Sequence, residues 1–118
     1  MNPDAADATY GYLTTTGRVS GRPHEVEIWF AVADGVVYVL SGSGGSSDWC
    51  RNLDAVPEAS FRIDDAAHEV RGRRVTDPEE DALARRAVYE KYRPRYAGDL
   101  IDWRDGSAPF ALDLVEGD

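Results

Sequence analysis

One stretch, residues 13–30 with the sequence LTTTGRVSGRPHEVEIWF, most constrains how this chain can fold. A β-rich run breaks into a turn of glycine, serine and arginine, and the chain then resumes with alternating residues. Over residues 24–32 every second side chain falls on the same face, which is the period of a half-buried strand. The stretch therefore predicts two strands joined by a polar turn.

The composition of this turn is typical of an anion-binding loop. Gly17 and Gly21 allow positive φ and let the backbone approach a ligand closely. Ser20 offers a hydroxyl, and Arg18 and Arg22 offer forked cationic donors that suit phosphate or carboxylate. A solvated hairpin that binds nothing can have the same composition, so the turn alone leaves both interpretations open.

Further strands follow at short intervals along the chain. Asp34-Gly35 is a strong hairpin signal, and it precedes a strand over residues 36–41. A flexible Gly/Ser loop covers residues 41–47, and Ser47 or Asp48 can cap a short helix that ends near Leu53. This loop is either a plain linker or a second set of backbone donors beside a ligand.

The C-terminal half adds strands over residues 59–63, 68–75 and 109–115 and one main helix. The helix begins at Asp77-Pro78, with an acidic residue three positions after the cap, and it ends near Tyr92. About six strands, one main helix and a short helix, without a βαβ rhythm, predict a mainly β (α+β) barrel that carries a helix. We expect residues 1–9 to form a flexible terminus and residues 10–118 to form a single domain.

Charge and composition exclude several classes of function. The net charge of −9 opposes binding to nucleic-acid phosphates, and no apolar run has the length of a membrane helix. The single cysteine, Cys50, cannot form an internal disulfide, and a cytosolic environment would keep its thiol reduced. Together with the lack of a membrane-length apolar run, this favours a soluble cytoplasmic protein. Cys50 itself is either a small buried residue or a nucleophile that would need an activating neighbour.

Aromatic residues gather between the main helix and the last strand. Tyr89, Tyr92, Tyr96 and Trp103 can pack a small core or form the lid of a pocket for a flat ring. The two histidines lack the spacing of metal ligands, and neither a nucleophile elbow, a P-loop nor a dinucleotide fingerprint is present. The sequence thus predicts no metal and leaves the catalytic residues unknown.

Four motifs in fixed order carry a family resemblance: LTTTGRVSGRP, EIWF, SGSGGSSDW and WCRNL. The chain resembles the deazaflavin (F420)-dependent nitroreductase family, which are split β-barrel oxidoreductases that use coenzyme F420. The resemblance is best over residues 12–75. Val19 and Ser43 stand where many family members carry basic residues.

The resemblance implies a cofactor site built from four segments. The first segment would hold the phosphate and the glutamyl tail, the strand after it would lie beneath the deazaflavin ring, and the other two would flank the ring. The implied cofactor-binding residues are Arg18, Val19, Ser20, His24, Glu25, Val26, Glu27, Ile28, Trp29, Leu40, Ser41, Gly42, Ser43, Asp48, Trp49, Cys50, Arg51 and Asn52. The aromatic segment with Tyr92, Tyr96 and Trp103 is the candidate substrate pocket.

The predicted activity is hydride transfer from reduced deazaflavin to an electron-poor small molecule such as a quinone, an enone or a nitro compound. In such a reaction the cofactor carries the difficult chemistry, and no side chain need be a dedicated base. Two alternatives keep the same barrel: a non-catalytic protein that stores or shields a cofactor or another ligand, and a relative that binds FMN. Split barrels often pair, so a homodimer is expected.

Overall fold

A single antiparallel sheet of seven strands in the order β2-β1-β5-β6-β7-β4-β3 organises the computed structural model, which describes residues 3–115. The strands are β1 (Gly11–Thr16), β2 (Pro23–Ile28), β3 (Ala31–Ala33), β4 (Val36–Ser41), β5 (Glu58–Ile63), β6 (Ala66–Arg74) and β7 (Ala108–Leu114). The helices are α1 (Asp48–Ala55), α2 (Pro78–Tyr92) and α3 (Ile101–Gly106), with short 3-10 turns η1 (Pro3–Asp7) and η2 (Arg93–Arg95). The fold is mainly β, as the sequence predicted.

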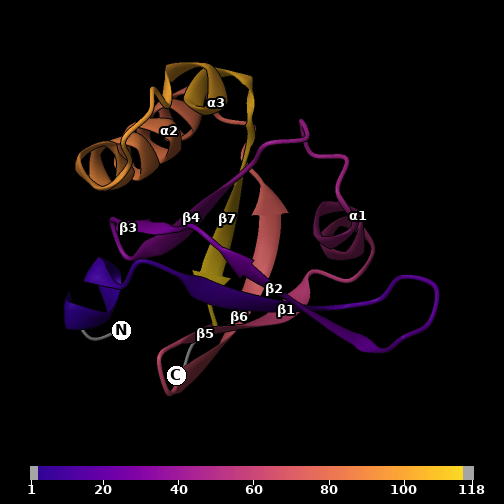
Figure 1. Cartoon of the computed structure of the whole chain (residues 1–118). Coiled ribbons are helices and arrows are strands. Elements are labelled where there is room, and N and C mark those ends of the chain that lie inside the picture. The colour runs from indigo at the N-terminus through magenta and orange to yellow at the C-terminus, as the bar shows by residue number, and fades with distance from the viewer. Residues whose placement is uncertain (1–2, 116–118) are drawn as a thin grey trace.

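The two edge strands of this sheet follow each other in the chain. Only Trp29 and Phe30 separate β2 from β3, although β2 and β3 stand at opposite ends of the strand order. The sheet must therefore curl until its two edges approach each other, which makes it a half-barrel (Figure 1). This confirms the predicted split β-barrel.

The long strand predicted over residues 24–32 is broken in the structure, which is why seven strands are present instead of about six. At the break, the Phe30 N–H donates to the Tyr92 hydroxyl (2.9 Å), and the Phe30 carbonyl accepts from Lys91 Nζ (2.8 Å). The backbone of Phe30 thus bonds to side chains of α2. Since a buried peptide needs partners, these contacts allow the chain to leave one sheet edge and enter the other.

The interior of the half-barrel holds the first of two apolar clusters. Its members are buried residues of the strands, of α1 and of the break between β2 and β3: Leu13, Phe30, Val37, Val39, Cys50, Leu53, Ala59, Phe61, Ile63, Val70, Phe110 and Leu112. Gly11 lies against the ring of Phe61, and a Cβ at this position would overlap that ring. The barrel interior is therefore filled by side chains around a glycine that makes room for an aromatic ring.

Helix α2 covers the outer face of β3 and β4 and builds the second cluster. Ala84, Val88 and Tyr92 are its buried residues, and their spacing of four residues places them on one face of the helix. Asp77 caps the helix by accepting from the Glu80 N–H (3.0 Å). In Figure 1, α2 and α3 lie together at one side of the sheet, away from α1.

An ionic network fastens the start of α2 to the sheet. The Arg73 guanidinium donates to both oxygens of Glu80 (2.7 and 2.8 Å) and to Asp113 (2.7 Å). The buried Tyr38 hydroxyl also donates to Glu80 (2.7 Å). Glu80 therefore joins α2 to β4 and β6.

Within residues 3–115, no helix combines the length and the apolar character that crossing a membrane requires.

Candidate functional site

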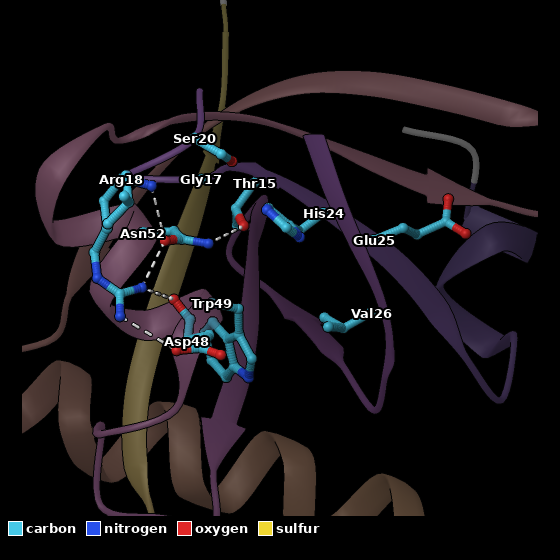
Figure 2. A pocket seen from close by; sticks show the side chains of 11 residues that line it. Thr15, Gly17, Arg18, Ser20, His24, Glu25, Val26, Asp48, Trp49 and Asn52 are labelled. Carbon is cyan, nitrogen blue, oxygen red and sulfur yellow. Dashed lines mark hydrogen bonds and ion pairs between the residues drawn. The ribbon is translucent and has the colours of Figure 1, made fainter. Parts of the chain in front are cut away.

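A pocket of about 370 Å³ opens between the turn that joins β1 to β2, the start of β2 and the first turns of α1 (Figure 2). This volume lies within the range of small-molecule sites. The lining residues are Thr15, Gly17, Arg18, Val19, Ser20, His24, Glu25, Val26, Asp48, Trp49 and Asn52.

Glycines determine the shape of the turn at the pocket. The Gly17 N–H donates to the Arg22 carbonyl (2.8 Å), and the Gly21 N–H donates to the Gly17 carbonyl (2.8 Å). Gly21 has φ of +73°, which favours glycine. At Gly17 a Cβ would lie 2.7 Å from Ser20 Oγ and 2.8 Å from His24 Nε2, so a larger residue would push these two side chains away.

Asn52 on α1 holds the turn in place from below. Its side chain is 3% exposed. The amide oxygen accepts from the Arg18 N–H (3.1 Å) and from Arg18 Nη1 (2.8 Å), and the amide nitrogen donates to Thr15 Oγ1 (3.1 Å). One buried amide therefore positions the backbone and the guanidinium of Arg18 relative to β1 (Figure 2).

Arg18 also reaches the start of α1. Its Nη2 lies 3.3 Å from Asp48 Oδ1, and its Nη1 lies 3.5 Å from the Asp48 carbonyl. The Asp48 side chain is 90% exposed, whereas that of Arg18 is 31% exposed. The guanidinium thus lies at the pocket rim with one partner buried and one in water.

The structure brings together part of the cofactor site implied by the family resemblance. Arg18, Val19, Ser20, His24, Glu25, Val26, Asp48, Trp49 and Asn52 line the pocket. Glu27, Ile28, Trp29, Leu40, Ser41, Gly42, Ser43, Cys50 and Arg51 are not among its lining residues. Leu40, Ser41 and Cys50 are buried within the fold, and the Cys50 thiol contacts Ser47 Oγ (3.2 Å).

Thr15 lines the pocket but was absent from the predicted site, and Gly17 was noted in the turn but not included among the implied cofactor-binding residues. The period of a strand places Thr15 on the same side of β1 as the buried Leu13, and Thr15 pairs directly with His24 of β2. Applying this alternation to the threonine run would have indicated Thr15.

The aromatic residues proposed as a substrate pocket form a cluster around Trp29. The Trp29 ring stacks on Tyr92 with 4.2 Å between centroids, and it meets Tyr96 and Trp103 edge-on at 5.8 and 5.5 Å. The Gly/Ser loop passes beside this cluster, because a Cβ on Gly42 would lie 3.3 Å from Trp103 Nε1. Trp29 and Gly42 therefore lie with the predicted substrate residues.

Within this cluster Tyr92 differs from its neighbours, because it is 1% exposed. Its hydroxyl accepts from the Phe30 N–H and donates to the Thr9 carbonyl (2.7 Å). Burial raises the pKa of Tyr92 to about 12. Tyr92 is therefore a neutral structural group at neutral pH, while Tyr96, 48% exposed, presents its ring to solvent.

Lys91 lies beside the same strand break and was not singled out from the sequence. Its Nζ is 3.6 Å from the centroid of the Phe30 ring and donates to the Phe30 carbonyl. Burial lowers the pKa of Lys91 to about 8. No signal within residues 24–32 could have indicated this partner, which comes from a helix 61 residues away.

Among residues 3–115, no group of three His, Cys, Asp or Glu side chains could hold a metal ion.

A family model of the F420H(2)-dependent quinone reductases matches residues 6–99. The chain belongs to this family. The family match and the half-barrel confirm the predicted resemblance to F420-dependent split β-barrel oxidoreductases.

Several solved structures share the fold of this F420H(2)-dependent quinone reductase family member over about nine-tenths of the chain or more. A conserved hypothetical protein, Rv2991 from Mycobacterium tuberculosis, has 23% identity and a TM-score of 0.77, over 97% of this chain and 81% of that one. A structure named F420-H2 dependent reductase (FDR-A) has 19% identity and a TM-score of 0.71, over 89% of this chain and 94% of that one. HutZ, a heme storage protein from Vibrio cholerae, has 19% identity and a TM-score of 0.69, over 96% and 86%.

Proposed function

We propose that this protein binds coenzyme F420 in the pocket beside Arg18 and catalyses reduction of an electron-poor small molecule such as a quinone, an enone or a nitro compound. The single observation that carries the proposal is the Arg18 guanidinium, held by the buried amide of Asn52 at a glycine turn, in a member of the F420H(2)-dependent quinone reductase family.

The chemistry of the pocket fits an anionic cofactor that also has a flat ring. Arg18 supplies a cationic fork, and the Thr15 and Ser20 hydroxyls add neutral hydrogen-bonding groups. The partly buried Val26 and Trp49 supply apolar surface in the same pocket. A polar rim combined with an apolar wall suits a ring that carries a phosphate-bearing tail.

Binding, orientation and water exclusion are the tasks that we propose for this chain's own residues. When bound, reduced deazaflavin supplies the hydride that the acceptor receives. Arg18 would bind the anionic part, and Asn52 would orient Arg18. Trp29, Tyr96 and Trp103 would pack against the acceptor, and solvent would provide the proton that completes the reduction, since Tyr92 holds its proton within the fold.

A binding protein without turnover is the second candidate. The loop tip favours it, because Val19 is 93% exposed and offers no charge, so Arg18 is the one arginine or lysine among the residues that line the pocket. HutZ, which has a similar fold, is described as a heme storage protein. FMN is a further ligand that the same barrel could take.

Two measurements separate these candidates. Fluorescence titration with F420, run beside FMN at the same salt concentration, tests the cofactor, and saturable micromolar binding of F420 in preference to FMN is expected. Oxidation of reduced F420 is then followed with quinones, enones and nitro compounds. Binding without turnover would favour the storage protein, and binding of neither cofactor would contradict the proposed function.

Among the described residues β2 pairs with β1 alone, and its free outer edge motivates a further part of the proposal, that two copies associate in solution as a homodimer. Analytical ultracentrifugation over a range of concentrations tests it, and a sedimentation coefficient that stays at the monomer value would contradict it.

A further inference from the structure

The two partners of the Arg18 guanidinium differ in kind. Asn52 is buried, and its oxygen accepts from Arg18 Nη1 at 2.8 Å while it also accepts from the Arg18 backbone N–H. Losing both bonds would leave the buried amide oxygen without these partners and would free the Arg18 backbone from α1. The Asn52 contact is therefore a fixed part of the fold.

Asp48 makes a much weaker contact with the same group. A single carboxylate oxygen approaches Nη2 at 3.3 Å, and the Asp48 side chain is 90% exposed. Exposed, single-point ion pairs contribute little, because water and salt screen both charges and the side chains lose conformational freedom. The carboxylate can therefore leave Arg18 without disturbing the rest of the turn.

Among the residues that line the pocket, no acidic side chain other than Asp48 forms an ion pair with Arg18. Glu25 also lines the pocket, but its carboxylate points away from Arg18 and Asn52 (Figure 2) and lies 3.8 Å from Arg62. Asp48 is thus the acidic side chain of the pocket that contacts the guanidinium.

We propose that Asp48 is an internal competitor for the anion site of Arg18, so that it limits the affinity of the pocket for phosphate- or carboxylate-bearing ligands. An incoming anion must displace the Asp48 carboxylate from Nη2 and then tolerate its charge nearby. Asn52 keeps the guanidinium in place during this exchange. The identity of the ligand as F420 rests on the proposed function, whereas the competition itself concerns any small anion.

The test compares the wild-type protein with Asp48→Asn and Asp48→Ser, which both remove the competing charge. Affinity for F420 is measured by fluorescence titration at low and at high salt. Inorganic pyrophosphate serves as a second probe, followed through the NMR signal of the Arg18 Nε–H. We expect both variants to bind each probe about three- to tenfold more tightly at low salt, with a smaller gain at high salt.

Asp54→Asn is the matched control, since it removes the same charge from the same helix. Asp54 pairs with Arg74 (2.7 Å), outside the residues that line the pocket. Its affinity should stay within about twofold of wild type. The gain from Asp48→Asn should also disappear in an Arg18→Ala background, because the competition requires the guanidinium.

Unchanged affinity of both Asp48 variants, an equal gain in Asp54→Asn, or a gain that survives Arg18→Ala would each overturn the proposal. These outcomes are independent of the cofactor. If the wild-type protein ignores F420 while Asp48→Asn binds pyrophosphate more tightly, the proposed function fails and the competition stands. If F420 binds equally to both proteins, the competition fails and the proposed function stands.

Discussion

Arg18 is the residue on which the proposed cofactor site depends most directly, because its guanidinium is the cationic fork at the pocket rim. We expect Arg18→Ala to weaken F420 binding by about 1.5–3 kcal/mol, the range for a charge-assisted hydrogen bond. Fluorescence titration measures this change. Arg22→Ala removes the same charge from the same turn without removing a pocket side chain and should bind as wild type does; unchanged affinity of Arg18→Ala would contradict the assignment.

Asn52 should matter first for stability. Asn52→Ala leaves the Thr15 hydroxyl and the Arg18 N–H without their partner, and we expect a loss of about 1–3 kcal/mol in the free energy of unfolding. Urea denaturation measures this loss. Arg51→Ala, at the exposed neighbouring position on α1, should change stability by less than about 0.5 kcal/mol. Equal stability of the two variants would show that the Asn52 amide does not hold the turn.

The sequence was most informative at this scale where a residue type has few alternative roles. Arginine and glycine in the turn indicated Gly17 and Arg18, which line the pocket, and also Gly21 and Arg22, which are not among its lining residues. The family resemblance implied whole runs of consecutive residues as cofactor-binding. Such runs include residues that cannot reach the cofactor, because neighbouring residues of a strand or helix point in different directions. Leu40 and Cys50 belong to such segments, and both side chains lie in the core.

At the scale of elements, the turns and helix ends that depend on a few neighbouring residues were predicted correctly from the sequence. Asp34 and Gly35 both have positive φ (52° and 78°) and form the hairpin between β3 and β4, as predicted. The start of α2 follows its capping signal at Asp77. The break between β2 and β3 could not be predicted, because the groups that satisfy the Phe30 peptide come from Lys91 and Tyr92.

The attachment of α2 to the sheet should depend on pH through Glu80. Hydrogen bonds from Arg73 and then from Tyr38 lower the pKa of Glu80 to about 2, below its ordinary value of 4.5. A carboxyl with a lowered folded pKa stabilises the fold fully above the unfolded value and loses this contribution as pH falls. The Glu80 contribution should therefore be complete above pH 4.5 and should disappear between about 4.5 and 2.

Glu80→Gln tests this dependence. The variant should be less stable than wild type at pH 7, by about 1–2 kcal/mol after allowance for solvent screening, and the difference should shrink as pH falls below 4.5. Urea denaturation between pH 2.5 and 7 measures both effects. Glu79→Gln, an exposed neighbour in the same helical turn, is the control. A stability difference for Glu80→Gln that stays constant across this range would contradict the assignment.

At the scale of the whole molecule, the curl of the sheet explains where the pocket lies. The turn between β1 and β2 reaches α1 because the curled sheet carries these elements toward each other, and Asn52 completes the contact. Period-two patterns and the absence of a βαβ rhythm sufficed to predict a barrel. They did not indicate how tightly the strands approach, which depends on packing between residues far apart in sequence, such as Gly11 and Phe61.

That approach makes Gly11 a test of the barrel itself. A Cβ at this position would overlap the buried Phe61 ring, so Gly11→Ala must displace a side chain that is 0% exposed and packed on all sides. We expect Gly11→Ala to lower the free energy of unfolding by about 1–3 kcal/mol, as overpacking does in other cores. Gly106→Ala is the matched control, since no atom of another part of the fold lies within 4 Å of a Cβ built there.

A double-mutant cycle tests whether Gly11 and Phe61 share the same space. Urea denaturation of Gly11→Ala, Phe61→Leu and the double variant should show strong coupling, because a smaller side chain at position 61 makes room for the new methyl group. Additive effects of the two substitutions would mean that Gly11 and Phe61 do not share the space at the centre of the half-barrel.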